Sequence, residues 1–301
     1  MDFEITKLIQ NKKKPETPED INVVCDSGAF NGLYMYGSML YLKKLEELEY
    51  IKVDKLSGSS IGSFLAFCYI IDKLDSLLEF YPKLRENYRL DHNLQYWKDA
   101  IDTFFTQLPE NIYEKVNNRL YINYYNIDTR EEKLKTCFAS KEEIKQTILY
   151  SSFVPYFMNG DMSYNGHIDG FNPYIFENRT IDDDKILFIH LSTPDKFKKC
   201  FHVKGEVNPD NRIFEGILET HKLFTNQYST LCSWVNNWGI KKYGILRIRQ
   251  LLWLLVVYIL YFVQKYKYLI PEKVYSNNVF LFFQNFVSKI YHDIFVLVYN
   301  S

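Results

Sequence analysis

Glycine is scarce in this sequence, which has only 12 glycines among 301 residues, well below the usual share of about 7%. Eight of the 12 fall in three short windows, at 28–37, 58–62 and 160–170. Glycine is needed where the backbone adopts conformations that side chains disfavour, or where two segments approach closely. We therefore expect these windows to hold loops whose backbone geometry matters for function.

The sequence also lacks the cysteine and leader patterns of secreted proteins. Its five cysteines have no CxxC spacing, which indicates buried thiols in a reducing compartment and excludes a disulfide framework or a zinc site. The first residues, MDFEITKLIQNKKK, contain no apolar segment typical of a signal peptide. The run Asp182–Asp184 lacks the spacing of a calcium loop. We expect an intracellular, membrane-associated protein that needs neither a metal nor a cofactor.

Acidic residues are missing from residues 220–271, which carry seven basic residues although the whole chain has a net charge of −1. This stretch is also the most apolar part of the sequence. Basic and apolar residues together favour an anionic membrane surface over nucleic acid. We therefore expect residues 241–267 to contact a membrane surface, and we expect no nucleic-acid partner.

The longest uninterrupted apolar run is Leu251–Val263, and its 13 residues would span about 20 Å as a helix. The hydrocarbon core of a membrane is about 30 Å thick. An interfacial helix or hydrophobic hairpin fits this length and the flanking charges best, followed by a core helix and then by a spanning helix. The later segment Val279–Tyr299 fits an amphipathic core helix.

Short apolar runs alternate with helical patterns along the rest of the chain. The runs typical of buried strands are Ile21–Cys25, Val53–Leu56 and Lys185–Ser192. Helical patterns cover Leu33–Leu48 and Ile61–Leu74, the second of which is almost uniformly apolar. This alternation predicts an α/β fold with a largely parallel sheet.

The segment Gly58-Ser59-Ser60-Ile61-Gly62 has the form G-x-S-x-G and lies between an expected strand and an expected buried helix. A serine on a sharp strand-to-helix turn needs small residues two positions before and after it, which Gly58 and Gly62 supply. The helix N-terminus favours the negative charge that develops during nucleophilic attack. Ser60 is therefore a candidate nucleophile, and the alternative is a packing turn whose serines cap the helix.

A second candidate element, Asp26 to Gly32, follows the first expected strand. Small residues there let backbone amides point at an anion. The dinucleotide fingerprint G-x-G-x-x-G is absent, because Ser27 and Ala29 stand where two glycines would be, and no Walker lysine follows. A phosphate cradle remains open, but an oxyanion hole is the better partner for a nearby serine nucleophile.

A third element is His167-Ile168-Asp169-Gly170. With it, the chain resembles the patatin-like phospholipase family over roughly residues 20–195. The segments that carry the resemblance are Gly28–Gly37, Gly58–Gly62, Ser151–Pro155 and Asp169-Gly170, in that order. The resemblance implies a three-layer α/β/α sandwich with a mostly parallel central sheet and a hydrophobic helical C-terminal extension. The expected parts are a flexible arm at 1–20, a patatin-like catalytic domain at 21–230 and a basic, apolar helical region at 231–301.

The resemblance also implies a Ser-Asp dyad without histidine, in which Ser60 is the nucleophile and Asp169 the base. The backbone amides of Ser27, Gly28 and Ala29 would form the oxyanion hole, and the motif glycines are Gly32, Gly58, Gly62 and Gly170. Burial would raise the Asp169 pKa from about 3.9 into a useful range. The implied activity is a carboxylic ester hydrolase of the phospholipase A or acylglycerol lipase type, with a phospholipid or acylglycerol as substrate.

The sequence departs from the family pattern in both loops. Ser27 and Ala29 replace glycines, Asn31 replaces a basic residue, and Phe171 replaces the Gly or Ala that follows Asp-Gly. These departures motivate one alternative, a catalytically weak or inactive patatin-like fold that acts as a membrane-bound interaction protein. Two others are a Ser-His-Asp triad that uses His167, and a soluble esterase or thioesterase whose C-terminus is core.

Overall fold

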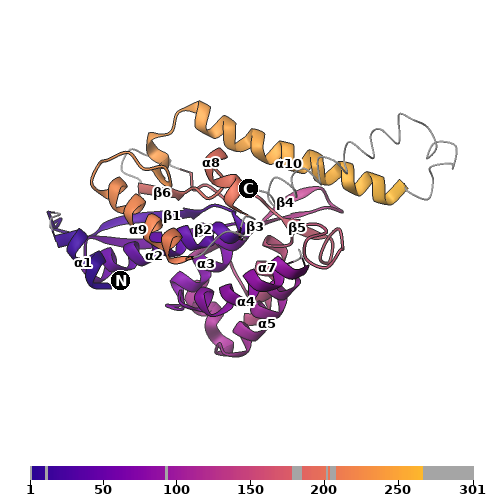
Figure 1. Ribbon diagram of the computed structural model, residues 1–301, viewed down its shortest axis with the longest axis horizontal. Coiled ribbons are helices and arrows are strands. Elements are labelled where there is room, and N and C mark those ends of the chain that lie inside the picture. Colours follow the sequence, from indigo (N-terminus) through magenta and orange to yellow (C-terminus); the bar gives the residue numbers. More distant parts are fainter. Residues whose placement is uncertain are drawn as a thin grey trace.

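The computed structural model describes residues 2–10, 13–91, 94–177, 185–200, 203 and 208–266 (Figure 1). Its strands are β1 Glu19–Cys25, β2 Ile51–Gly58, β3 Leu120–Asn126, β4 Glu131–Lys135, β5 His167–Asp169, β6 Lys185–Ile189 and β7 Cys232–Trp234. They form one sheet in the order β4-β3-β2-β1-β6-β7, and β5 also pairs with β3. The four central strands are parallel, whereas β4, β5 and β7 run antiparallel to their neighbours.

Helices flank this sheet (Figure 1). In the described residues they are α1 Asp2–Gln10, α2 Gly32–Glu47, α3 Ile61–Ile70, α4 Ser76–Asp91, α5 Gln95–Thr106, α6 Tyr113–Val116, α7 Lys141–Ser151, α8 Pro194–Phe197, α9 Asp210–Phe224 and α10 Ile240–Tyr266. In Figure 1, α10 runs along the opposite side of the molecule from α4, α5 and α7. The predicted α/β fold, with a central sheet between helices and an apolar C-terminal helix, is confirmed.

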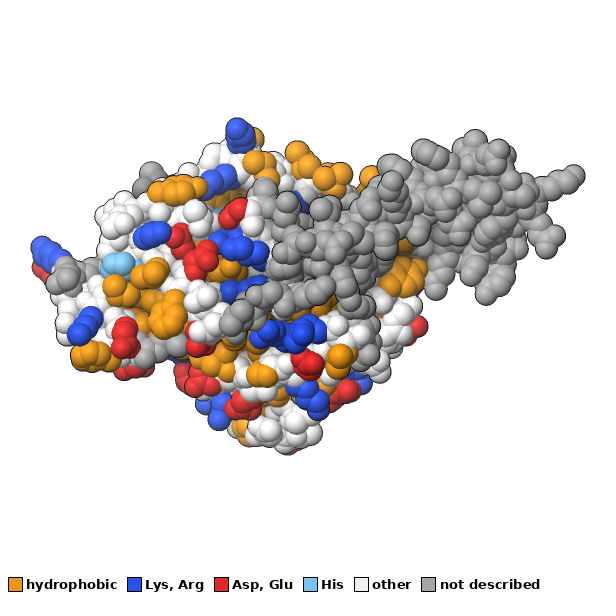
Figure 2. Space-filling view, in the orientation of Figure 1, with side chains coloured by type: hydrophobic (Ala, Val, Ile, Leu, Met, Phe, Trp, Pro, Cys, Tyr) orange, Lys and Arg blue, Asp and Glu red, His pale blue; other side chains and the backbone are white. Residues whose placement is uncertain are grey.

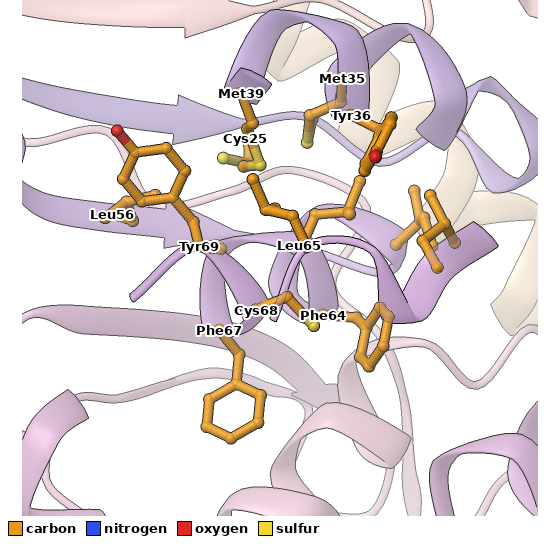
Figure 3. Packing of buried hydrophobic residues seen from close by; sticks show 14 of the residues in the cluster. Cys25, Met35, Tyr36, Met39, Leu56, Phe64, Leu65, Phe67, Cys68 and Tyr69 are labelled. Carbon is orange, nitrogen blue, oxygen red and sulfur yellow. The ribbon is translucent and has the colours of Figure 1, made fainter. Parts of the chain in front are cut away.

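Helix α3 lies inside the fold, and all ten of its residues are buried. Figure 3 shows Leu65 directed toward Cys25 of β1 and Met35 of α2, whereas Phe67 points away from them. The rings of Phe64 and Phe67 pack on aromatic residues of α4 and α5, namely Phe80, Phe104 and Phe105. The uniformly apolar sequence explains this position, because a helix without a polar face is stable only when it is surrounded by protein or lipid. Helix α3 is therefore a fixed support for the residue at its N-terminus.

The first residues differ from the flexible arm expected at 1–20. Helix α1 occupies Asp2–Gln10 and buries Ile5 and Ile9 completely or nearly so. These isoleucines stand four positions apart, so they share one face of the helix and pack on the core together. The polar residues between them hide this short amphipathic pattern in the sequence.

Helix α10 begins at Ile240 and has 27 residues, twice the length of the apolar run that the sequence singled out. Its segment Ile240–Phe262 is long and apolar enough to cross a membrane by length and composition, and only 11% of the most apolar window is buried. This exposure is not that of a core helix. The other expected C-terminal helix, Val279–Tyr299, lies outside the described residues, as does the Asp182–Asp184 run.

Candidate active site

Ser60 occupies a sharp turn between the end of β2 and the start of α3. Its backbone angles are φ 55° and ψ −130°, a conformation that a residue with a side chain rarely adopts and that costs free energy. The Ser60 amide donates to the Ser151 carbonyl (3.0 Å) and lies 3.1 Å from the Ser151 hydroxyl, and these contacts hold the turn. The Ser60 side chain makes no capping hydrogen bond with α3, so the hydroxyl is not used as a helix cap.

The flanking glycines are required by close approach of the backbone. A Cβ atom on Gly58 would lie 2.4 Å from the carbonyl oxygen of Gly62, and one on Gly62 would lie 2.5 Å from the carbonyl oxygen of Cys25. Both distances are far below van der Waals contact, so no side chain fits at either position. The remaining motif glycines lie near the same site, because a Cβ on Gly32 would touch Ile61 of α3 and one on Gly170 would touch Asn123 of β3.

Asp169 ends β5 and is only 2% exposed. Its Oδ1 atom accepts hydrogen bonds from the Ser59 hydroxyl (3.0 Å) and the Phe171 amide (2.8 Å). Burial raises the pKa of Asp169 to about 7, although hydrogen bonds from Phe171, Ser60 and Ser59 act in the opposite direction. The Asp169 carboxylate thus bonds to the hydroxyl of the residue before Ser60, and its raised pKa suits proton transfer near neutral pH.

The Ser151–Pro155 segment links the two residues. Ser151 holds the Ser60 amide, and the Phe153 carbonyl accepts a hydrogen bond from the Asp169 amide (2.9 Å). This segment, the third of those that carry the family resemblance, therefore sets the distance between the proposed nucleophile and the proposed base.

The loop after β1 brings Ser27, Gly28 and Ala29 to the same end of the sheet. Ala29 has a φ of 43°, a conformation in which a glycine would be less strained. The Ser27 amide is already bonded to the Asp26 carboxylate (3.0 Å), so it is not free to stabilise an oxyanion as the sequence analysis expected. Within the described part of the chain, the amides of Gly28 and Ala29 have no hydrogen-bond partner, and they are the remaining candidates.

Asn31 is fully buried, and its side chain fixes the loop that follows β1 to other segments of the fold. Its side-chain amide donates to the carbonyls of Leu191 (2.8 Å) and Lys196 (2.9 Å), and its Oδ1 accepts from Arg212 of α9 (3.0 Å). A basic side chain therefore reaches this loop from another element, at the position where the family pattern has one in the loop itself. Sequence reasoning missed Arg212, since nothing in the pattern of α9 marks it.

The position of the Arg249 side chain also differs from the one that the sequence predicts. Arg249 belongs to the basic residues that were expected to face a membrane, but its guanidinium pairs with the buried Asp26 carboxylate (2.7 Å), and the side chain is only 25% exposed. Two polar residues in succession, Arg249 and Gln250, within an apolar helix were the available signal for this inward contact.

The three described histidines, His167, His190 and His221, form no hydrogen bond with Ser60 or Asp169. His167 stacks on Tyr150 with ring centroids 4.2 Å apart, and its Nε2 atom lies 3.0 Å from the Asn126 amide nitrogen. His190 lies in the core, where burial lowers its pKa to about 4. His92, His202 and His292 lie outside the described residues.

Among the described residues, no three His, Cys, Asp or Glu side chains come together in a group that could hold a metal ion. The groups gathered at the cluster are a hydroxyl, a buried carboxylate that can accept a proton, and backbone amides that can bind an oxyanion.

No family model matches the chain. A curated relative, patatin-like phospholipase domain-containing protein 4 of Homo sapiens, is 27% identical over 143 residues, which are 45% of this chain and 56% of that protein. The chain thus spans little more than half the length of this relative. Among solved structures, VipD from Legionella pneumophila covers 58% of this chain and 51% of its own, with a TM-score of 0.35 and 13% identity. The distant similarity to the human protein supports the resemblance to patatin-like phospholipases that the motifs predict.

Proposed function

We propose that the protein is a serine lipid acyl hydrolase that works with a Ser60–Asp169 dyad at a membrane surface. The observation that carries the proposal is the position of Ser60, on a strained turn at the N-terminus of a buried helix. The preceding residue, Ser59, donates a hydrogen bond to the buried Asp169 carboxylate, whose pKa is raised to about 7. The similarity to a human patatin-like phospholipase domain-containing protein supports a lipid ester as substrate, either a phospholipid or an acylglycerol.

In the proposed reaction, Asp169 accepts the proton of the Ser60 hydroxyl while the Ser60 oxygen forms a bond to the ester carbonyl carbon. The amides of Gly28 and Ala29 and the N-terminus of α3 stabilise the oxyanion. The bond from the carbonyl carbon to the alcohol then breaks, and Asp169 returns the proton to the leaving alcohol. Water attacks the acyl-enzyme by the same route and releases the fatty acid, which restores Ser60.

The proposed contact with the membrane is the outer face of α10. Its exposed apolar side chains recur at helical spacing: Ile245, Ile248, Leu252, Leu255, Ile259 and Phe262. Lys241, Lys242 and Arg247 are exposed near the start of the same helix. Figure 2 shows hydrophobic and basic side chains side by side on the edge along which α10 runs. An apolar face with basic residues fits the interface of an anionic bilayer.

The test compares wild-type protein with Ser60→Ala on mixed liposomes, with lipid products identified by mass spectrometry. We expect the rate of acyl hydrolysis by Ser60→Ala to be at least about 10³-fold below that of the wild type. The melting temperature should be unchanged. A fluorophosphonate probe should label the wild type at Ser60. Ser59→Ala is the control for the neighbouring hydroxyl and should still be labelled at Ser60, because the nucleophile remains.

Wild-type hydrolysis by Ser60→Ala would overturn the assignment of the nucleophile. A folded wild-type protein that the probe does not label in detergent would favour the inactive, membrane-bound interaction protein.

A further inference from the structure

One side chain of α10 reaches both loops that flank the proposed dyad. The Arg249 guanidinium donates to Asp26 through Nη2 to Oδ1 (2.7 Å) and Nη1 to Oδ2 (3.1 Å). Its Nε atom donates to the Asn172 side-chain oxygen (3.1 Å), and its Nη2 atom contacts the same oxygen. Asp26 precedes the oxyanion loop, and Asn172 follows the turn that bears Asp169. The guanidinium thus connects the two loops from outside the sheet.

On one side of this bridge, the Asp26 carboxylate organises the oxyanion loop. It is fully buried, and it accepts hydrogen bonds from the amides of Ser27 (3.0 Å), Leu191 (3.0 Å) and Ser192 (3.1 Å). Burial of a carboxylate costs free energy unless the carboxylate is paired with an opposite charge and hydrogen-bonded. Arg249 supplies that partner, so the orientation of Ser27 and of the amides that follow it depends on a residue of α10.

On the other side, α10 holds the turn that bears the base. The Phe171 ring stacks on Trp253 with centroids 3.7 Å apart, and the Phe171 amide donates to Asp169. The Asn172 side-chain amide donates to the Leu246 carbonyl (2.9 Å). Leu246, Arg249 and Trp253 share one face of α10, because they are spaced three and four positions apart. Phe171, a departure from the family pattern, is thus the contact through which α10 holds this turn.

We infer that Arg249 is a positioning residue that aligns the oxyanion loop with the Asp169 turn, so that the docked α10 helix is part of the active site. The inference rests on the proposed function. It differs from a purely membrane-binding role of α10 in one respect that can be measured. A membrane-binding residue matters only when the substrate is in a bilayer, whereas a positioning residue matters for any ester.

The experiment measures kcat and KM on p-nitrophenyl butyrate, a water-soluble ester, for the wild type, Arg249→Gln, Arg249→Lys and the control Arg89→Gln. Arg89 pairs with Glu86 of its own helix, and both side chains are exposed. We expect Arg249→Gln to lower kcat about 100-fold, the loss typical of a misplaced oxyanion donor, with little change in KM. Arg249→Lys should give an intermediate kcat, because an ammonium cannot bind Asp26 and Asn172 together.

Binding to phosphatidylcholine–phosphatidylserine vesicles is measured for the same proteins and should be unchanged by Arg249→Gln, since Arg249 faces inward. A folded Arg249→Gln protein with wild-type kcat on the soluble ester would overturn the inference. A loss confined to vesicle substrates would also overturn it, because it would assign Arg249 to membrane binding.

Removal of Arg249 alone leaves the buried Asp26 without its partner, which destabilises a fold strongly. The double variant Asp26→Asn/Arg249→Gln removes both charges and should melt at a higher temperature than Arg249→Gln while its kcat stays about 100-fold low. Wild-type kcat in the double variant would show that the pair only balances charge, and would overturn the inference. A wild-type protein that neither hydrolyses esters nor reacts with the probe would instead remove the proposed function.

Discussion

Helices α3 and α10 are both rich in apolar residues, yet they lie in opposite surroundings. All ten residues of α3 are buried, whereas only 11% of the apolar window of α10 is buried. The difference lies in the neighbouring residues: α3 has no charge and follows a glycine turn, whereas α10 carries basic residues at both ends. The hydropathy of a helix alone therefore does not distinguish a buried helix from an exposed one.

Both helices contribute residues to the proposed site at the carboxyl end of the central strands. The N-terminus of α3 presents Ser60, and the inner face of α10 holds the loops on either side of it through Arg249 and Trp253. In the proposed function, α3 carries the nucleophile, and α10 both supports the loops and contacts the membrane. Each of the following predictions tests one part of this division.

The largest effect is expected at Asp169, the proposed base. Asp169→Asn cannot accept a proton, so kcat on a soluble ester should fall roughly 10²–10⁴-fold, the usual contribution of a general base. His167→Ala is the matched control, because His167 contacts Tyr150 and Asn126. Full activity of Asp169→Asn together with loss in His167→Ala would replace the dyad with a histidine-dependent triad.

The next prediction compares how much a leucine of each helix contributes to the free energy of unfolding. Leu65 of α3 is completely buried, whereas Leu252 of α10 is 58% exposed. Leu65→Ala should lower the free energy of unfolding by about 2–5 kcal/mol, and Leu252→Ala by less than about 0.5 kcal/mol. Urea denaturation measures both.

The same two substitutions should affect binding to lipid vesicles in the opposite order. Leu252→Ala should bind anionic vesicles more weakly, and Leu65→Ala should bind them as well as the wild type while it remains folded. A large loss of stability in Leu252→Ala would mean that the outer face of α10 is covered by protein and would contradict the proposed membrane contact.

Much of the site could be predicted from the sequence because its chemistry is local. The strand-to-helix turn at Gly58–Gly62 follows from two glycines and an apolar helix, and the structure shows that their Cβ atoms would clash with backbone. Asp169 could be placed near Ser60 only through the family resemblance, since β5 reaches the site by pairing with β3, and no local pattern encodes that pairing.

The contacts that could not be predicted are those between distant segments. Arg249 and Asp26 are 223 residues apart, and an arginine beside an apolar run has the same pattern whether it faces lipid or protein. The bond of the Ser27 amide is different, because it is local: the amide donates to the carboxylate of the preceding residue, Asp26, and the orientation of that side chain cannot be predicted from the sequence. Helix α1 was missed for a different reason, namely that its burial involves only the two isoleucines of a short polar stretch.

The pH dependence tests the surroundings of Asp169. Since the dyad needs an ionised carboxylate and the Asp169 pKa is raised to about 7, kcat/KM should rise with pH and level off above about 7. The folded protein also holds this proton more tightly than the unfolded chain, so the stability that it contributes is present below about pH 4 and is lost as the pH rises to about 7. Asp169→Asn should remove this loss, which thermal melts at pH 5 and pH 8 can measure.

A pH-independent rate between pH 5 and pH 8 would contradict the role of Asp169 as base. A pH-dependent rate that persists in Asp169→Asn would assign the titration to another group.

The smallest effect concerns the basic end of α10. Lys241 and Lys242 are exposed, and each lysine near an anionic membrane surface contributes about 1 kcal/mol to binding. The double variant Lys241→Gln/Lys242→Gln should therefore bind phosphatidylserine-containing vesicles more weakly in low salt, and the difference should shrink as salt screens the charges. Neutral phosphatidylcholine vesicles provide the control, because the apolar face of α10 is unchanged in this variant. An equal loss on neutral vesicles would show that these lysines act by packing, for instance through the contact of Lys242 with the Trp238 ring, and would leave the apolar face as the whole of the membrane contact.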